Sequence, residues 1–176
     1  MTATHIRDLL LGRIGGALDP RGIRLAGARI TGHLDLTDVC SSIPVQLDGC
    51  RFDEPVILVR AELPALSLRS AVLPSLCASR VSVRHCLDLA GLTVTSRGGH
   101  GAVQLEEACI GQLDLVGATL TNDDGPALLA DGLRVGSGVR LVNLTATGHG
   151  ERGAVRLSGA HIDGQLDLMG ATLTND

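Results

Sequence analysis

The sequence predicts an all-β protein: a right-handed parallel β-helix, a solenoid with a short N-terminal capping helix. Three observations support this prediction. Apolar residues recur at every fifth position, a longer repeat occurs in two nearly identical copies, and the 176 residues include one phenylalanine, no tryptophan and no tyrosine but 23 glycines, which suits a narrow aliphatic core. The expected domains are residues 1–20, the capping helix and its linker, and residues 21–176, the β-helix.

The N-terminal segment predicts the helix. Thr4 is the expected N-cap of a helix from His5 to about Ile14, with Gly15 and Gly16 ending it. An end coil left open exposes unpaired backbone, so a helix at this end is expected to cover the first coil. Its apolar residues toward that coil are Ile6, Leu9, Leu10 and Ile14.

The long repeat is clearest in the second half of the chain. Residues 111–123 read GQLDLVGATLTND and residues 164–176 read GQLDLMGATLTND, so the copies differ only at Val116 against Met169. Weaker copies that share Leu-Asp-Leu begin at Gly27 and Val83. Such self-similarity predicts stacked structural units.

A shorter period lies inside the long one. Leu105, Ile110, Leu115 and Leu120 fall five residues apart, and each has a second apolar residue two positions before it. Two inward side chains then flank one outward side chain, as in a short extended segment, and the last two positions turn the chain. Amphipathic helices and long strands have other spacings.

These units resemble the pentapeptide-repeat family, whose loose consensus is Ala, then Asp or Asn, then Leu, then two variable residues. The resemblance covers about Ile23 to the C-terminus, with Leu or Val often replacing the first Ala. It implies four units per coil and about six coils, spaced about 4.8 Å apart. The strings RLAGARITGHLDL and CRFDEPV also look like long repeat proteins of high-GC bacteria, some loosely labelled oxidoreductases.

Three polar, Gly-rich insertions follow groups of four units, and we expect them to stack at one corner. They span residues 95–101, 121–126 and 147–153. Residues 174–176 repeat residues 121–123, so the last coil is predicted to be bare. An uncapped coil invites either continuation in a longer chain or end-to-end pairing of two copies.

Four residues at equivalent repeat positions, Asp88, Asp114, Arg140 and Asp167, are expected to form an outward ladder. Paired carboxylates could perform acid–base chemistry, but the repeat itself produces this spacing, which favours a solvated face. Asp35 sits in the same local motif, and its face stays open.

The corner insertions hold the one polar cluster that the sequence singles out: His100, Asp123, Asp124 and His149. The two histidines are expected about 10 Å apart, two coils from each other, which is too far to share a metal. We therefore expect no catalytic residue, metal or cofactor, and treat this cluster and the ladder as a candidate interaction surface.

Cysteines and glycines have structural explanations. Five cysteines without CxxC spacing fit reduced thiols, with Cys50 inward, Cys77 and Cys109 outward, and Cys40 and Cys86 near turns. The glycines of residues 96–101 and 135–139 are expected at corners with positive φ, in place of a nucleotide-binding loop.

Net charge and hydropathy exclude some classes of function. A net charge of −4 with scattered arginines disfavours direct nucleic-acid binding, and no 18-residue apolar run predicts a membrane span, so the expected location is the cytoplasm. The leading hypothesis is a non-catalytic scaffold or protein–protein interaction module of unknown partner. The resemblance implies an alternative, a DNA-mimicking binder of DNA gyrase that gives inhibitor resistance. A redox enzyme is the third hypothesis.

Overall fold

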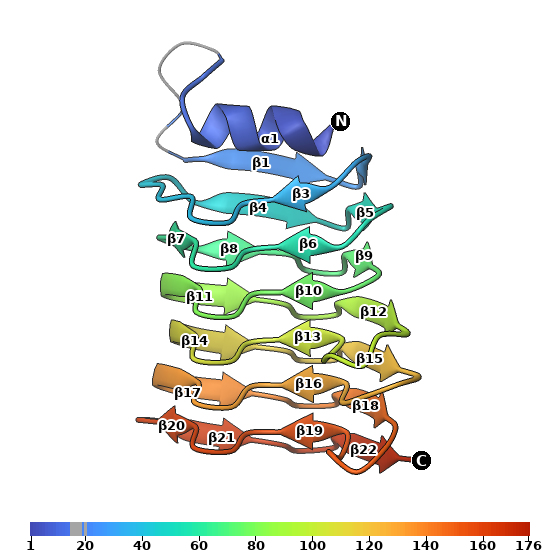
Figure 1. Ribbon diagram of the computed structural model, residues 1–176. Helices are drawn as coiled ribbons and strands as arrows, with labels where there is room; N and C mark the ends of the chain where they lie inside the picture. The colour runs from blue at the N-terminus through green and yellow to red at the C-terminus, as the bar shows by residue number, and fades with distance from the viewer. Residues whose placement is uncertain (15–18, 20) are drawn as a thin grey trace.

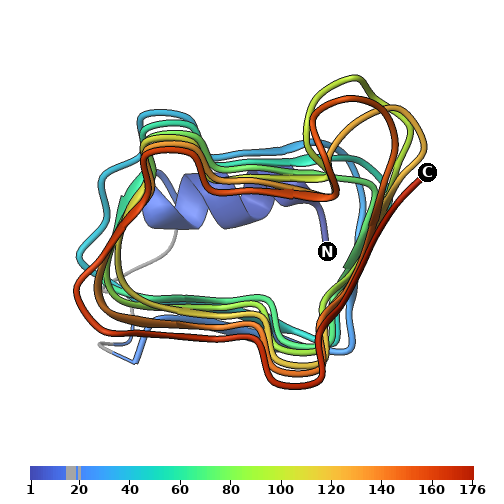
Figure 2. The ribbon, with the colours of Figure 1, turned by 90° about the horizontal axis from the view of Figure 1, so that it is seen from below.

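The computed structural model describes residues 1–14, 19 and 21–176. One helix, α1 (Ala3–Leu10), precedes a stack of short parallel strands that wind into a β-solenoid (Figure 1). Viewed along the axis, the coils superpose on a four-sided outline (Figure 2). The predicted all-β solenoid with one short N-terminal helix is confirmed.

The strands form three hydrogen-bonded sheets. The largest contains β1 (Ile23–Ala26), β4 (Val45–Asp48), β7 (Glu62–Leu63), β8 (Leu66–Ser67), β11 (Ser82–Asp88), β14 (Cys109–Asp114), β17 (Arg134–Arg140), β20 (His161–Ile162) and β21 (Gln165–Asp167). The second contains β2 (Arg29–Ile30), β5 (Arg51–Phe52), β9 (Val72–Leu73), β12 (Thr93–Ser96), β15 (Thr119–Asn122), β18 (Thr145–Gly148) and β22 (Thr172–Asn175). The third contains β3 (Leu34–Asp35), β6 (Val56–Ile57), β10 (Leu76–Cys77), β13 (Val103–Gln104), β16 (Leu128–Leu129) and β19 (Val155–Arg156).

The largest sheet bends, so the solenoid has four faces. The bend is a register shift between Val83 and Cys86 in β11 and between Ile110 and Gln112 in β14. We call the part after the bend the first face, with β1, β4, β8 and β21, and the part before it the fourth face, with β7 and β20. The β2–β22 sheet is the second face and the β3–β19 sheet is the third.

The strand register shows that the coils lengthen along the chain. Leu66 pairs with Leu87, Leu87 pairs with Leu113, and Val139 pairs with Leu166, so the later partners lie further apart in sequence than the first. The added residues are the three corner insertions, which protrude together at one corner in Figure 2. Backbone bonds join them, as from the His149 N–H to the Gly125 carbonyl at 3.0 Å, so the predicted stacking is confirmed.

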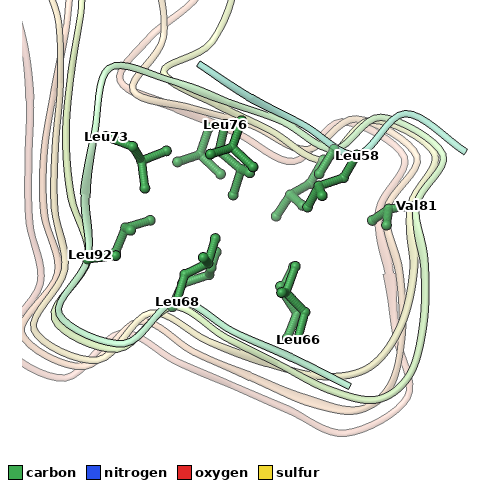
Figure 3. Close-up of a cluster of buried hydrophobic side chains, with 14 of the residues drawn as sticks. Leu58, Leu66, Leu68, Leu73, Leu76, Val81 and Leu92 are labelled. Carbon is green, nitrogen blue, oxygen red and sulfur yellow. The ribbon is translucent and has the colours of Figure 1, made fainter. Parts of the chain in front are cut away.

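The core is a column of aliphatic side chains supplied by every face. Leu66 and Leu68 of the first face point toward Leu58 and Leu76 of the third, and Leu73 and Leu92 close the side between them (Figure 3). Leu68, Leu76 and Leu92 have no exposed surface. Burying each such side chain stabilises the fold by about 1.5–3 kcal/mol.

Two corners use left-handed backbone in every coil. One lies between the first and second faces and the other between the third and fourth. Their positive-φ residues are Gly27, Gly49, Ser70, Gly91, Gly117, Asn143 and Gly170 at the first corner and Asp38, Arg60, Arg80, Glu107, Gly132 and Gly159 at the second.

The prediction of positive φ for the glycines of residues 96–101 and 135–139 is wrong, because those glycines have ordinary φ. Close packing explains two of them instead. A Cβ on Gly101 would lie 2.7 Å from Leu129 Cβ, and one on Gly138 would lie 2.9 Å from the Gln165 carbonyl oxygen.

Helix α1 covers the first coil, although its predicted bounds are wrong. It begins at Ala3, because Thr2 pairs with Thr31 of the first coil and the Ala3 N–H donates to the Thr31 carbonyl at 2.9 Å. Thr4 is therefore a helical residue and not the N-cap. The helix ends at Leu10, before the predicted end at Ile14, and Gly15 and Gly16 lie outside the described residues.

The opposite end of the stack is open. Leu166, Leu168 and Leu173 are 38%, 40% and 47% exposed. Their counterparts two coils earlier, Leu113, Leu115 and Leu120, have no exposed surface. These apolar side chains of the last described coil are therefore exposed.

Candidate functional site

The predicted ladder exists on the first face. Asp88 pairs in register with Asp114, Asp114 with Arg140, and Arg140 with Asp167. The repeat therefore places these four residues on neighbouring coils, at one outward position. Asp114 is the most enclosed of them, with its side chain 13% exposed.

Each aspartate of the ladder stabilises the turn that directly follows it in the chain. One carboxylate oxygen accepts the N–H two residues later, at 3.1 Å for Asp88, 2.9 Å for Asp114 and 3.0 Å for Asp167. This is the Asx-turn geometry that favours aspartate where a strand ends. Aspartate therefore recurs at this repeat position because it stabilises the turn that follows the strand.

The second carboxylate oxygen of two of these aspartates accepts from an arginine. The Arg140 guanidinium donates to Asp114 at 2.9 Å, and Arg69 donates to Asp88 at 3.2 Å. Both arginine side chains are more than half exposed, so solvent screens these pairs and each contributes at most about 1 kcal/mol. The first face thus presents both carboxylate and guanidinium groups.

Asp35 lies on a different face from the ladder. It belongs to β3 of the third face, in register with Ile57. Its side chain accepts the Thr37 N–H at 2.8 Å. Hydrogen bonding to Thr37, first to its side chain and then to this N–H, lowers the pKa of the Asp35 carboxyl, with a smaller contribution from Arg7. Arg7 of α1 also donates to the Asp35 carbonyl, which ties the helix to the first coil.

The corner insertions bring the predicted histidine and aspartate residues to one corner. His100, Asp123 and Asp124 are exposed there, and Arg97 lies 3.3 Å from the Asp123 carboxylate. His149 is half-buried, with Nδ1 3.0 Å from the carbonyl oxygen of Asn122.

Asn122 organises this corner, and sequence reasoning missed it. Its side chain has no exposed surface and donates to the carbonyls of His100 at 2.5 Å and Pro126 at 3.0 Å. Its Oδ1 accepts the Asp124 N–H at 3.3 Å. The sequence contains a signal for this role, because Asn122 recurs as Asn175 in the second copy of the long repeat. Asn175 also donates to a carbonyl of its corner insertion, that of Gly150, at 2.9 Å. The asparagine recurs every second coil, as does the long sequence repeat.

A second charged column was also missed, at the corner between the third and fourth faces. Arg60 donates to Asp38 at 2.6 and 2.8 Å, and Arg80 donates to Glu107 at 2.8 Å. These hydrogen bonds lower the pKa values of the Asp38 and Glu107 carboxyls. Sequence reasoning had not aligned these positions, because the coils that separate Asp38, Arg60, Arg80 and Glu107 contain different numbers of residues.

A shallow groove follows this corner. It is lined by Ser79, Arg80, Glu106, Glu107 and Asp131, and the Ser79 hydroxyl lies 2.8 Å from the Glu106 carboxylate. Within the described residues, no group of three or more His, Cys, Asp or Glu is placed to hold a metal ion.

Cys50, Cys77 and Cys109 lie as predicted, whereas Cys86, predicted near a turn, lies within strand β11. Cys50 is buried, Cys77 is half-buried at an outward position and Cys109 is exposed. Cys86 lies at the bend of β11, where burial, followed by the carboxylates of Asp88 and Asp114, raises the pKa of its thiol. A raised pKa disfavours the reactive thiolate.

No protein-family model and no curated protein sequence matches this chain. In the part of the chain that the structure describes, no helix has the length and apolar character needed to cross a membrane.

Proposed function

We propose that this chain is a solenoid of the pentapeptide-repeat kind that acts as a non-catalytic scaffold or protein–protein interaction module. The register supports the repeat type, because the coil that runs from Leu66 to its partner Leu87 accommodates four units of five and a single additional corner position. The free cysteines fit a reducing compartment such as the cytoplasm.

The observation that carries the proposal is the use of the polar side chains. Asp88, Asp114 and Asp167 hold turns, and Asn122 holds the corner insertions. Side chains that recur because they stabilise turns give a rigid rod, and a rod whose surface carries charges of both signs offers a protein partner many complementary contacts.

Matched charge reversals on two faces test this proposal. The chain is immobilised, and proteins retained from a bacterial lysate are identified and purified. We expect a retained protein whose affinity falls with Arg140→Glu on the first face and is unchanged with Arg84→Glu, an exposed residue of β11 near its bend. Equal binding to the parent and both variants would overturn the assignment to the first face. A flavin or nicotinamide that co-purifies with the chain would overturn the non-catalytic proposal.

A supercoiling assay distinguishes the DNA-mimicking gyrase binder from the general interaction module. Arg140 stands directly between Asp114 and Asp167 on the first face, and this break in the acidic column favours a general protein partner over imitation of DNA phosphates. We expect purified bacterial gyrase to retain its activity and its quinolone sensitivity when the chain is added. Protection from the quinolone would favour DNA mimicry instead.

A further inference from the structure

The second face carries two parallel columns of threonine. Each of its last four strands contains Thr-x-Thr, and the strands pair in register. The threonines of the first column are Thr93, Thr119, Thr145 and Thr172, and those of the second are Thr95, Thr121, Thr147 and Thr174.

The side chains of both columns point outward, because the residues between them point inward. Val94, Leu120 and Ala146 have no exposed surface, whereas Thr119 and Thr145 are exposed. The strands of this face superpose closely along the axis, and the corner insertions extend beyond one end of it (Figure 2).

The strand geometry sets a regular lattice of hydroxyl groups. Neighbouring coils lie about 4.8 Å apart, and residues two apart along a strand are separated by about 6.6 Å. Oxygen atoms on a prism face of ordinary ice also repeat in two perpendicular directions, at intervals of comparable size. The array therefore approximates the spacing of an ordered surface of water in both directions.

This array differs chemically from the other faces. The outward positions of the first face include Asp88, Asp114 and Arg140, whereas the threonine columns carry no charge over four coils. Each threonine combines one hydroxyl with one methyl group, and branching at Cβ restricts its χ1 angle. A surface whose groups are already ordered loses little entropy on binding.

The geometry points to ice as a ligand: we propose that the threonine columns of the second face adsorb to ice crystals. The hydroxyls take positions of lattice water, and the methyl groups order the water between them. An adsorbed rod pins the crystal front, so ice must grow as curved surface between pinned points. Growth stops until the temperature falls further. This function is independent of any protein partner on the first face.

The test measures thermal hysteresis and ice-crystal shape with the full chain. We expect faceted crystals and a gap between the melting and growth temperatures. Thr119→Lys and Thr145→Lys, in the middle of the first column, should abolish both effects. Ser82→Lys, at an exposed outward position of the fourth face, should leave them unchanged.

Circular dichroism shows whether each variant keeps its fold, and Thr119→Ser, which removes one methyl group, serves as a second variant that preserves the hydroxyl. We expect it to weaken the hysteresis without loss of structure. Disc-shaped, unfaceted crystals with the folded parent chain would overturn the proposal. Equal hysteresis in the parent and the folded Thr119→Lys and Thr145→Lys variants would also overturn it, because another surface would then bind the ice.

Discussion

Replacing Asn122 by alanine should loosen the corner at which the insertions stack. The substitution removes two donated hydrogen bonds, to the His100 and Pro126 carbonyls, and one that Oδ1 accepts from the Asp124 N–H. Because Asn122 has no exposed surface, water cannot simply replace its side chain.

The structure sets the size of this effect. A neutral hydrogen bond contributes about 1 kcal/mol, so losing three lowers the free energy of unfolding by about 3 kcal/mol. For a domain of this size, that corresponds to a fall in Tm of about 6–12 °C. Asn175→Ala is the matched control, because it occupies the same position in the last coil but is exposed and donates one hydrogen bond. A surface change of this kind costs below about 0.5 kcal/mol.

Thermal unfolding followed by circular dichroism compares the two variants, and hydrogen exchange reports on the insertions. We expect Asn122→Ala to melt well below the parent and Asn175→Ala to melt close to it. Exchange should accelerate at residues 97–101 and 123–126 in the first variant. Equal melting of the two variants would refute the reasoning, because the bonds of the buried side chain would then contribute no more than those of the exposed one.

Three further predictions concern other parts of the solenoid. Gly111→Ala should destabilise the fold by about 1–3 kcal/mol, because its Cβ would clash with the backbone carbonyl oxygens of Arg84 and His85, whereas Gly136→Ala, with 3.7 Å of clearance, should melt like the parent. The stability that Arg80 lends to Glu107 should be present at neutral pH and disappear as the pH falls below the ordinary glutamate pKa of about 4.3 and through the lowered folded-state value, so melting curves of the parent and Arg80→Gln should converge in acid. If the bare last coil joins two copies, Leu166→Glu should lower the dimer fraction in sedimentation experiments, and a parent that stays monomeric at all concentrations would contradict end-to-end pairing.

The sequence predicted much of the fold because a solenoid repeats one local pattern. The five-residue spacing of Leu105, Ile110 and Leu115 predicts that these side chains point inward, and each of them is buried. The same logic aligned Asp88, Asp114, Arg140 and Asp167, since equal repeat phase places residues on one face.

The helix bounds could not be obtained in this way. Thr4 has the chemistry of an N-cap, but a backbone contact between Ala3 and Thr31 starts the helix earlier. That contact joins residues far apart in sequence, so local preference did not reveal it.

By itself, the sequence determined the solenoid, its core positions and the stacked insertions, because each follows from the period and the polarity of neighbouring residues. Only the tertiary structure placed Asp35 on the third face, buried Asn122 among the insertions and paired Arg60 with Asp38. These depend on how many residues each coil contains, which decides which side chains from neighbouring coils stand one above another. A change of one residue in coil length moves a side chain to another position, and short-range pattern does not record that change.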